Sequence, residues 1–136
     1  MEQKDYLLRE IEKIGRIISY IRQLLTGRNE STSLTMESSI NQASEMLLKE
    51  SDFDFNKFLI LNIEESNEYI SNFKGFSIEN IELLADCIYE IWLTYHPSDS
   101  NKYLQKALQL YELCNLRSKT YSIKRENQII AIKNTL

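Results

Sequence analysis

The residue types that most often carry out chemistry are scarce in this chain, which has one histidine and two cysteines among 136 residues. His96 precedes Pro97, and no Glu-x-x-His or His-x-x-x-His spacing surrounds it to hold a metal ion. We interpret His96 as a helix-terminal residue that interacts with the helix dipole. Cys87 and Cys114 each have apolar neighbours within predicted helices, where a free cysteine behaves as a small buried hydrophobe. We therefore expect neither a disulfide nor a redox pair.

A group of polar residues in the middle of the chain matches part of a calcium-binding loop. Asp52, Asp54 and Asn56 occupy the first three ligand positions of such a loop. The match then fails, because Lys57 stands where the sharp turn requires glycine and Ile63 stands where the bidentate acid belongs. We expect no metal ion here.

Three further acids cluster on a short polar segment, at Glu64, Glu65 and Glu68. No histidine or second acidic motif accompanies them, so we interpret the cluster as a solvated face. The chain has only three glycines, and it contains neither a GxGxxG motif nor a P-loop to cradle a phosphate. These patterns predict a protein that is not an enzyme, with no catalytic residue, no metal ion and no cofactor.

The last segment of the chain interleaves cations with an aromatic residue. Its members are Arg117, Lys119, Tyr121, Lys124 and Arg125. Such a mixture can contact phosphates and stack a base, but cations late in a helix also complement the helix dipole. Because the whole chain is acidic, with a net charge of −4, nucleic acid is the less favoured partner. A nucleic-acid-associated regulatory protein that uses this basic C-terminal helix is the alternative function.

Charge is unevenly distributed along the chain. Residues 1–28 sum to +2, residues 29–99 to −11 and residues 100–136 to +5. We expect the basic ends to fold back on the acidic middle. The alternative is a basic surface that stays open for a partner.

Composition predicts an all-α fold in one domain over residues 1–136. The hydrophobic fraction of 43% and the charged fraction of 26% are typical of a globular protein. With three glycines and one proline, the chain lacks the regular turn signals of an all-β protein. We expect a small helical bundle of about five to six helices.

The N-terminus and the apolar runs bear on location. The opening sequence MEQKDYLLRE carries charges where a signal peptide needs an unbroken apolar core. Apolar runs elsewhere extend over only a few residues, which is too short to span a membrane. We expect a cytoplasmic protein with no membrane partner.

The strongest periodic pattern lies in the predicted helix 4–26, which should end at Gly27. Its apolar residues alternate in steps of four and three, the spacing of a helix-packing seam. Gly15 costs about 1 kcal/mol relative to alanine inside a helix, which a close helix crossing at that position would offset. The seam consists of Leu7, Ile11, Ile14, Ile18, Ile21 and Leu25.

Polar residues divide the rest of the chain. Residues 28–33, RNESTS, predict a loop, and Ser77 followed by an acid in the first turn is typical of a helix start. Pro97 disfavours the helical conformation in the residue before it. The predicted helices are 34–49, 56–61, 64–72, 78–95 and 101–116, with 117–136 as a terminal helix.

The segment 78–116 resembles a tetratricopeptide repeat, in which two antiparallel helices meet through small residues at fixed places. Ala85 matches the small residue of the first helix of the repeat. Ala107, Tyr111 and Cys114 match the small, aromatic and small residues of the second helix. The resemblance implies a C-terminal tetratricopeptide-like antiparallel helix hairpin.

The chain also resembles an uncharacterised bacterial helical family with an N-terminal Asp-Tyr-x-x-Arg-x-Ile-Glu helix and a C-terminal tetratricopeptide-like hairpin. The opening motif corresponds to Asp5, Tyr6, Arg9, Ile11 and Glu12. This resemblance implies a helical fold and supplies no mechanism or site.

Broad apolar helix faces predict a non-catalytic protein–protein interaction or scaffold module. We expect a protein partner, and self-association as a homodimer is part of this prediction. The candidate interaction residues are Leu7, Ile11, Ile14, Ile18 and Ile21 of the first helix, together with Arg117, Lys119, Tyr121, Lys124 and Arg125.

Overall fold

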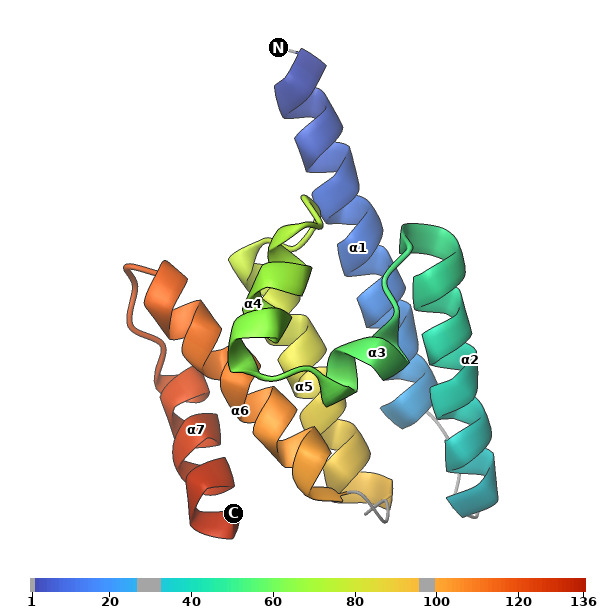
Figure 1. The fold of residues 1–136 in the computed structure, drawn as a ribbon, viewed down its shortest axis with the longest axis vertical. Coiled ribbons are helices and arrows are strands. Elements are labelled where there is room, and N and C mark those ends of the chain that lie inside the picture. The colour runs from blue at the N-terminus through green and yellow to red at the C-terminus, as the bar shows by residue number, and fades with distance from the viewer. Residues whose placement is uncertain (1, 27–32, 96–99) are drawn as a thin grey trace.

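The computed structural model describes residues 2–26, 33–95 and 100–136, and these ranges form seven helices and no strand (Figure 1). The expected all-α fold is confirmed. In these ranges, no helix combines the length and the apolar composition needed to cross a membrane. The predicted helix end at Gly27 and the role of His96 lie outside the described residues. The helices are α1 (Glu2–Thr26), α2 (Ser33–Ser51), α3 (Phe55–Ile60), α4 (Ile63–Ser71), α5 (Ile78–Tyr95), α6 (Ser100–Arg117) and α7 (Ile123–Thr135).

Two N-terminal caps divide the middle of the chain into the short helices α3 and α4. Asp54 caps α3, because its side chain accepts a hydrogen bond from the Lys57 amide at 3.1 Å. Asn62 and Glu65 form a reciprocal capping box at the start of α4. The two short helices agree with the predicted ranges 56–61 and 64–72, and the described residues contain seven helices where about five to six were expected. Asp54 therefore has a structural role as a helix cap, which accounts for an acid at this position without a calcium ion.

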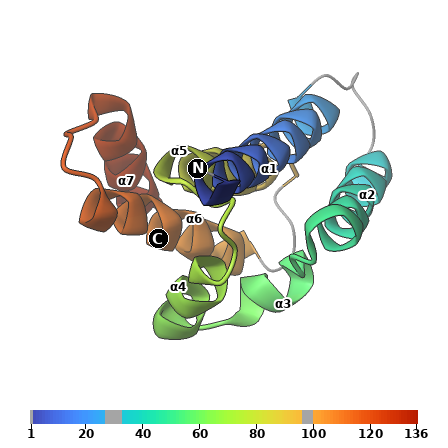
Figure 2. The same cartoon turned by 90° about the horizontal axis from the view of Figure 1, so that it is seen from above.

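The helices α5 and α6 form the centre of the fold. They run antiparallel, as predicted for residues 78–116 (Figure 1). Ala85 on α5 and Ala107 on α6 are both fully buried. The helix α1 packs on α5, α2 packs on α1, and α7 packs on α6 (Figure 2). In the described part of the chain, the buried apolar side chains belong to one continuous core.

The predicted seam of α1 is confirmed as a packing surface, but it is used inside the molecule. Ile14, Ile18 and Ile21 are at most 5% exposed, so these three candidate interaction residues cannot contact a partner. Ile11 is half-buried and Leu7 is 40% exposed, because the first turns of α1 project beyond the body of the molecule (Figure 1).

Two glycines allow α1 to pack closely on this part of the molecule. Gly15 lies where α1 crosses α5, and Gly75 lies in the turn that precedes α5. A Cβ atom on Gly15 would lie 3.1 Å from the Oδ1 atom of Asn80 on α5, which confirms the predicted close helix crossing. A Cβ atom on Gly75 would lie 2.5 Å from Ile14 Cγ1 and 2.6 Å from the carbonyl oxygen of Glu10. The Asn80 amide holds this junction by donating to the carbonyl oxygens of Ile11 at 2.8 Å and of Gly75 at 2.7 Å.

The prediction of one terminal helix over 117–136 was wrong at its start. The helix α6 continues through Arg117, and α7 begins only at Ile123. Between them, the Ser118 hydroxyl accepts from the Thr120 amide at 3.1 Å, and such side-chain bonds compete with helical backbone bonds. Ser122 then caps α7 by accepting from the Arg125 amide at 3.1 Å.

Candidate binding cleft

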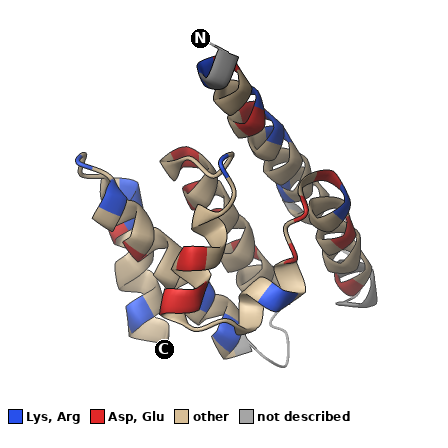
Figure 3. Ribbon diagram, turned by 45° about the horizontal axis from the view of Figure 1, so that its top comes forward, with Lys and Arg blue, Asp and Glu red and all other residues tan. Residues whose placement is uncertain are grey.

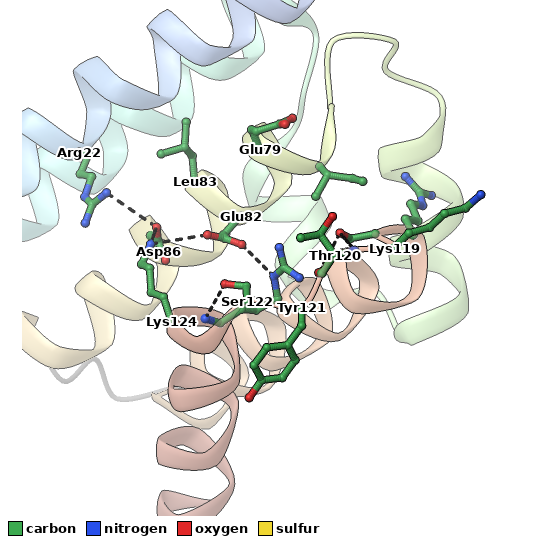
Figure 4. Close-up of a pocket in the computed structure, with 14 residues that line it drawn as sticks. Arg22, Glu79, Glu82, Leu83, Asp86, Lys119, Thr120, Tyr121, Ser122 and Lys124 are labelled. Atoms are coloured by element: carbon green, nitrogen blue, oxygen red, sulfur yellow. Dashed lines mark hydrogen bonds and ion pairs between the residues drawn. The ribbon is translucent and has the colours of Figure 1, made fainter.

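A cleft of about 670 Å³ lies between α5 and the loop that joins α6 to α7 (Figure 4). Arg22 of α1, the first half of α5 and the segment from Arg117 to Arg125 line it. The structure therefore brings the whole predicted C-terminal set into one place. That set is Arg117, Lys119, Tyr121, Lys124 and Arg125.

Asp86 of α5 anchors the inner end of the cleft. Its residue exposure is only 6%, and its two carboxylate oxygens contact three other helices. Tyr111 of α6 donates its hydroxyl proton to Oδ1. Lys124 Nζ of α7 lies 2.9 Å from Oδ2, and Arg22 Nη1 of α1 lies 3.7 Å from the same atom. One carboxylate thus joins α5 to α1, α6 and α7.

Glu82 lies one turn before Asp86 on α5 and pairs with two cations of α7. Arg125 Nε is 2.8 Å from Glu82 Oε1, and Lys124 Nζ is 3.6 Å from Oε2. Arg125, itself 6% exposed, also donates to Asn115 Oδ1 at 2.9 Å. The expectation that the basic ends fold back on the acidic middle is confirmed by these pairs.

The cleft keeps an excess of positive charge at its rim. Among the described residues, five basic and three acidic side chains line it. The carboxylates of Glu82 and Asp86 are paired with cations, and that of Glu79 is exposed. The side chains of Lys119 and Tyr121 are exposed and point outward from the rim (Figure 4). Arg117 is also exposed and donates to Ser71 Oγ at 2.5 Å. Basic residues gather in this loop and at the start of α7 (Figure 3).

Four members of this network escaped the sequence prediction, namely Arg22, Glu82, Asp86 and Tyr111. A signal for two of them was present, because Glu82 and Asp86 are four residues apart in a helix that is otherwise largely apolar. Acids at that spacing share one helix face, and a buried carboxylate requires a cation or a donor. Their partners come from distant segments, so spacing alone could not identify them.

The nucleophilic side chains near the core are held in unreactive forms. Burial raises the pKa of both Cys87 and Cys114 to about 12, so neither thiol ionises at neutral pH. Burial, and then the hydrogen bond to Asp86, raise the pKa of the Tyr111 hydroxyl. Both cysteines are buried and free, which confirms that they pack as small hydrophobes.

A second buried cation, Lys106 of α6, lies outside the cleft lining. Its Nζ donates to the carbonyl oxygen of Leu61 at 2.8 Å, to Gln109 Oε1 at 3.1 Å and to Ser66 Oγ. The same atom lies 4.7 Å from the centre of the Phe58 ring. Burial lowers the pKa of Lys106 to about 8. These contacts fasten α6 to the junction of α3 and α4.

Comparison with known proteins identifies no relative: no family model, curated protein or solved structure matches this chain. The function of the protein is therefore inferred from the geometry of the cleft. Among the residues that the structure describes, no group of three or more His, Cys, Asp or Glu side chains could hold a metal ion. The cleft has two paired carboxylates inside, the exposed carboxylate of Glu79 and the exposed cations Arg117 and Lys119, which leaves an excess of positive charge in its lining.

Proposed function

We propose that this protein is a non-catalytic interaction module whose cleft binds an acidic segment of a partner protein. The excess of cations at the cleft rim is the observation that supports it. Cations already pair with Glu82 and Asp86, which leaves the exposed Glu79 as the other acid of α5 in the lining. An incoming carboxylate would meet the two rim cations Lys119 and Arg117.

The packing of the molecule supports an interaction module with a rigid binding surface. Arg22, Lys124 and Arg125 reach the cleft from α1 and α7 and are positioned by α5, so the cleft wall is built before a partner arrives. A preformed site loses less conformational entropy on binding. The likeness of α5 and α6 to a tetratricopeptide hairpin belongs to the same proposal, which the complete burial of Ala85 and Ala107 supports. A cytoplasmic location is also part of it, which the two free cysteines favour.

Nucleic acid is the second candidate partner, and the basic segment 117–125 favours it. Two cations of that segment, Lys124 and Arg125, are engaged with acids of α5. Arg117 and Lys119 remain at the exposed rim. Because affinity for nucleic acid grows with the number of neutralised phosphates, two rim cations favour this partner less than a short acidic segment.

The test measures binding of a fluorescein-labelled hexaglutamate peptide to the intact chain by fluorescence anisotropy at low salt. We expect saturable binding that weakens with added salt, and about fivefold weaker binding to Lys119→Glu. Lys49→Glu is the matched control, because Lys49 is an exposed lysine on α2, outside the cleft lining.

Absence of binding by the wild-type chain, or equal loss in both variants, would contradict the proposal. A labelled oligonucleotide of similar charge is measured in parallel. Tighter binding of the oligonucleotide, lost in Lys119→Glu, would favour the nucleic-acid function instead.

A further inference from the structure

A second hollow adjoins the cleft on the side of α1. It is a shallow groove of about 540 Å³, lined by one face of α1 and by Leu83 of α5. Leu83 also lines the cleft. The two hollows therefore meet at Leu83, and we refer to this pair of hollows as the trough.

Apolar atoms form most of the surface at the α1 end of the trough, although the polar residues Ser19 and Gln23 also line it. Gly15 and Ser19 contribute little side-chain bulk, and the ring of Tyr20 is 45% exposed beside them. The charged residues at this end, Glu12 and Arg16, pair with one another at 3.8 Å. This end therefore offers an aromatic ring and Leu83 without an excess of charge.

The two ends of the trough differ in chemistry, and the difference specifies a ligand. We infer that the trough binds one partner segment that carries apolar side chains at one end and acidic side chains at the other. The apolar end packs on Leu83 and Tyr20, and the acidic end lies at Lys119 and Arg117. This inference rests on the proposed function. It adds that the apolar and the acidic side chains lie in two separate blocks along the partner segment.

Physical reasons favour a two-part segment over an acidic one alone. Exposed charge pairs contribute little affinity, whereas a buried tyrosine ring is a frequent source of interface energy and burial of apolar area at Leu83 adds to it. Ser19 and Tyr20 are both exposed on this face of α1, so a partner side chain can reach them. The cations at the other end would fix the direction of the segment.

Peptides of equal composition test the order of groups. One labelled peptide has three leucines followed by three glutamates, and the other alternates leucine with glutamate. We expect the block peptide to bind the intact chain about fivefold more tightly than the alternating peptide, and more tightly than hexaglutamate.

Variants of α1 test the apolar end. Tyr20→Ala removes the ring and places a good helix former on an exposed position. We expect this variant to bind the block peptide about fivefold more weakly and to bind hexaglutamate with unchanged affinity. Tyr6→Ala is the matched control, because Tyr6 is 51% exposed on the same helix and does not line the trough. Leu83→Ala is the second variant, and we expect it also to weaken binding of the block peptide, because Leu83 lines both hollows.

The outcomes separate this inference from the proposed function. If hexaglutamate binds in a Lys119-dependent way but the block peptide binds no more tightly, the inference is wrong and the proposed function stands. If none of the peptides binds, both are wrong. Concentration-dependent dimerisation that Tyr20→Ala abolishes would mean that a second copy occupies the trough, which would also overturn the inference.

Discussion

The helices α1 and α7 both pack against the central hairpin, but different forces hold them. The inner half of α1 is fixed by a row of buried isoleucines and by the backbone contact at Gly75. In α7, Ile129 and Ile132 are the buried apolar residues, and Lys124 and Arg125 bind acids of α5.

This contrast relates stability to function. Apolar packing at α1 is insensitive to ionic strength, whereas ion pairs weaken when salt screens them. The ion pairs that attach α7 to α5 also place Lys124 and Arg125 in the lining of the cleft. The same contacts that stabilise α7 therefore influence which ligands the cleft can bind.

Removal of the Asp86 carboxylate should have the largest effect. Asp86→Ala leaves the buried Tyr111 hydroxyl without its acceptor and removes the nearer of the two acidic partners of Lys124. We expect the free energy of unfolding to fall by about 3 kcal/mol, measured by urea denaturation. Glu112→Ala is the control, because its pair with Lys133 is about half exposed on both sides, and we expect a loss of about 0.5 kcal/mol or less. Equal losses would show that Asp86 is not a buried anchor.

Added bulk at Gly75, where the turn before α5 packs on α1, should cause the second-largest loss of stability. Gly75→Ala places a methyl group against Ile14 and the Glu10 backbone, so we expect a loss of about 2 kcal/mol. Gly15→Ala meets a looser contact at Asn80, and the better helix propensity of alanine offsets it, giving a change within about 0.5 kcal/mol. Thermal unfolding of both variants checks the order, and a neutral Gly75→Ala would contradict the close packing of this junction.

Buried Lys106 predicts a smaller effect that depends on pH. Its pKa is lowered to about 8 from 10.5, so between these values the unfolded chain binds a proton that the folded chain has lost. Stability should therefore rise with pH in this window, by about 1 kcal/mol.

The measurement is the difference in urea stability between wild type and Lys106→Met from pH 7 to about 10.5. Both proteins contain Tyr111, whose raised pKa removes stability above about pH 10, so that contribution cancels in the difference. A difference that does not change with pH would show that Lys106 titrates normally.

The fold was largely predictable from local signals, and the cleft was predictable only in part. Helical periodicity and capping residues located α1, α5 and α6 to within a few residues, because these signals act within one helix. The loop at 118–122 was missed, since Ser118 and Thr120 break the helix through hydrogen bonds that propensity does not reveal. The network around Asp86 was missed because it depends on tertiary contacts among four helices.

Hydrogen exchange of the intact chain, with and without the block peptide of leucines and glutamates, tests the binding cleft most directly. Bound peptide should slow exchange in the loop 118–122, at the start of α7 and in the first half of α5, and leave α2 and α3 unchanged. Protection confined to α2 and α3, or to the projecting end of α1, would contradict the cleft as the binding site.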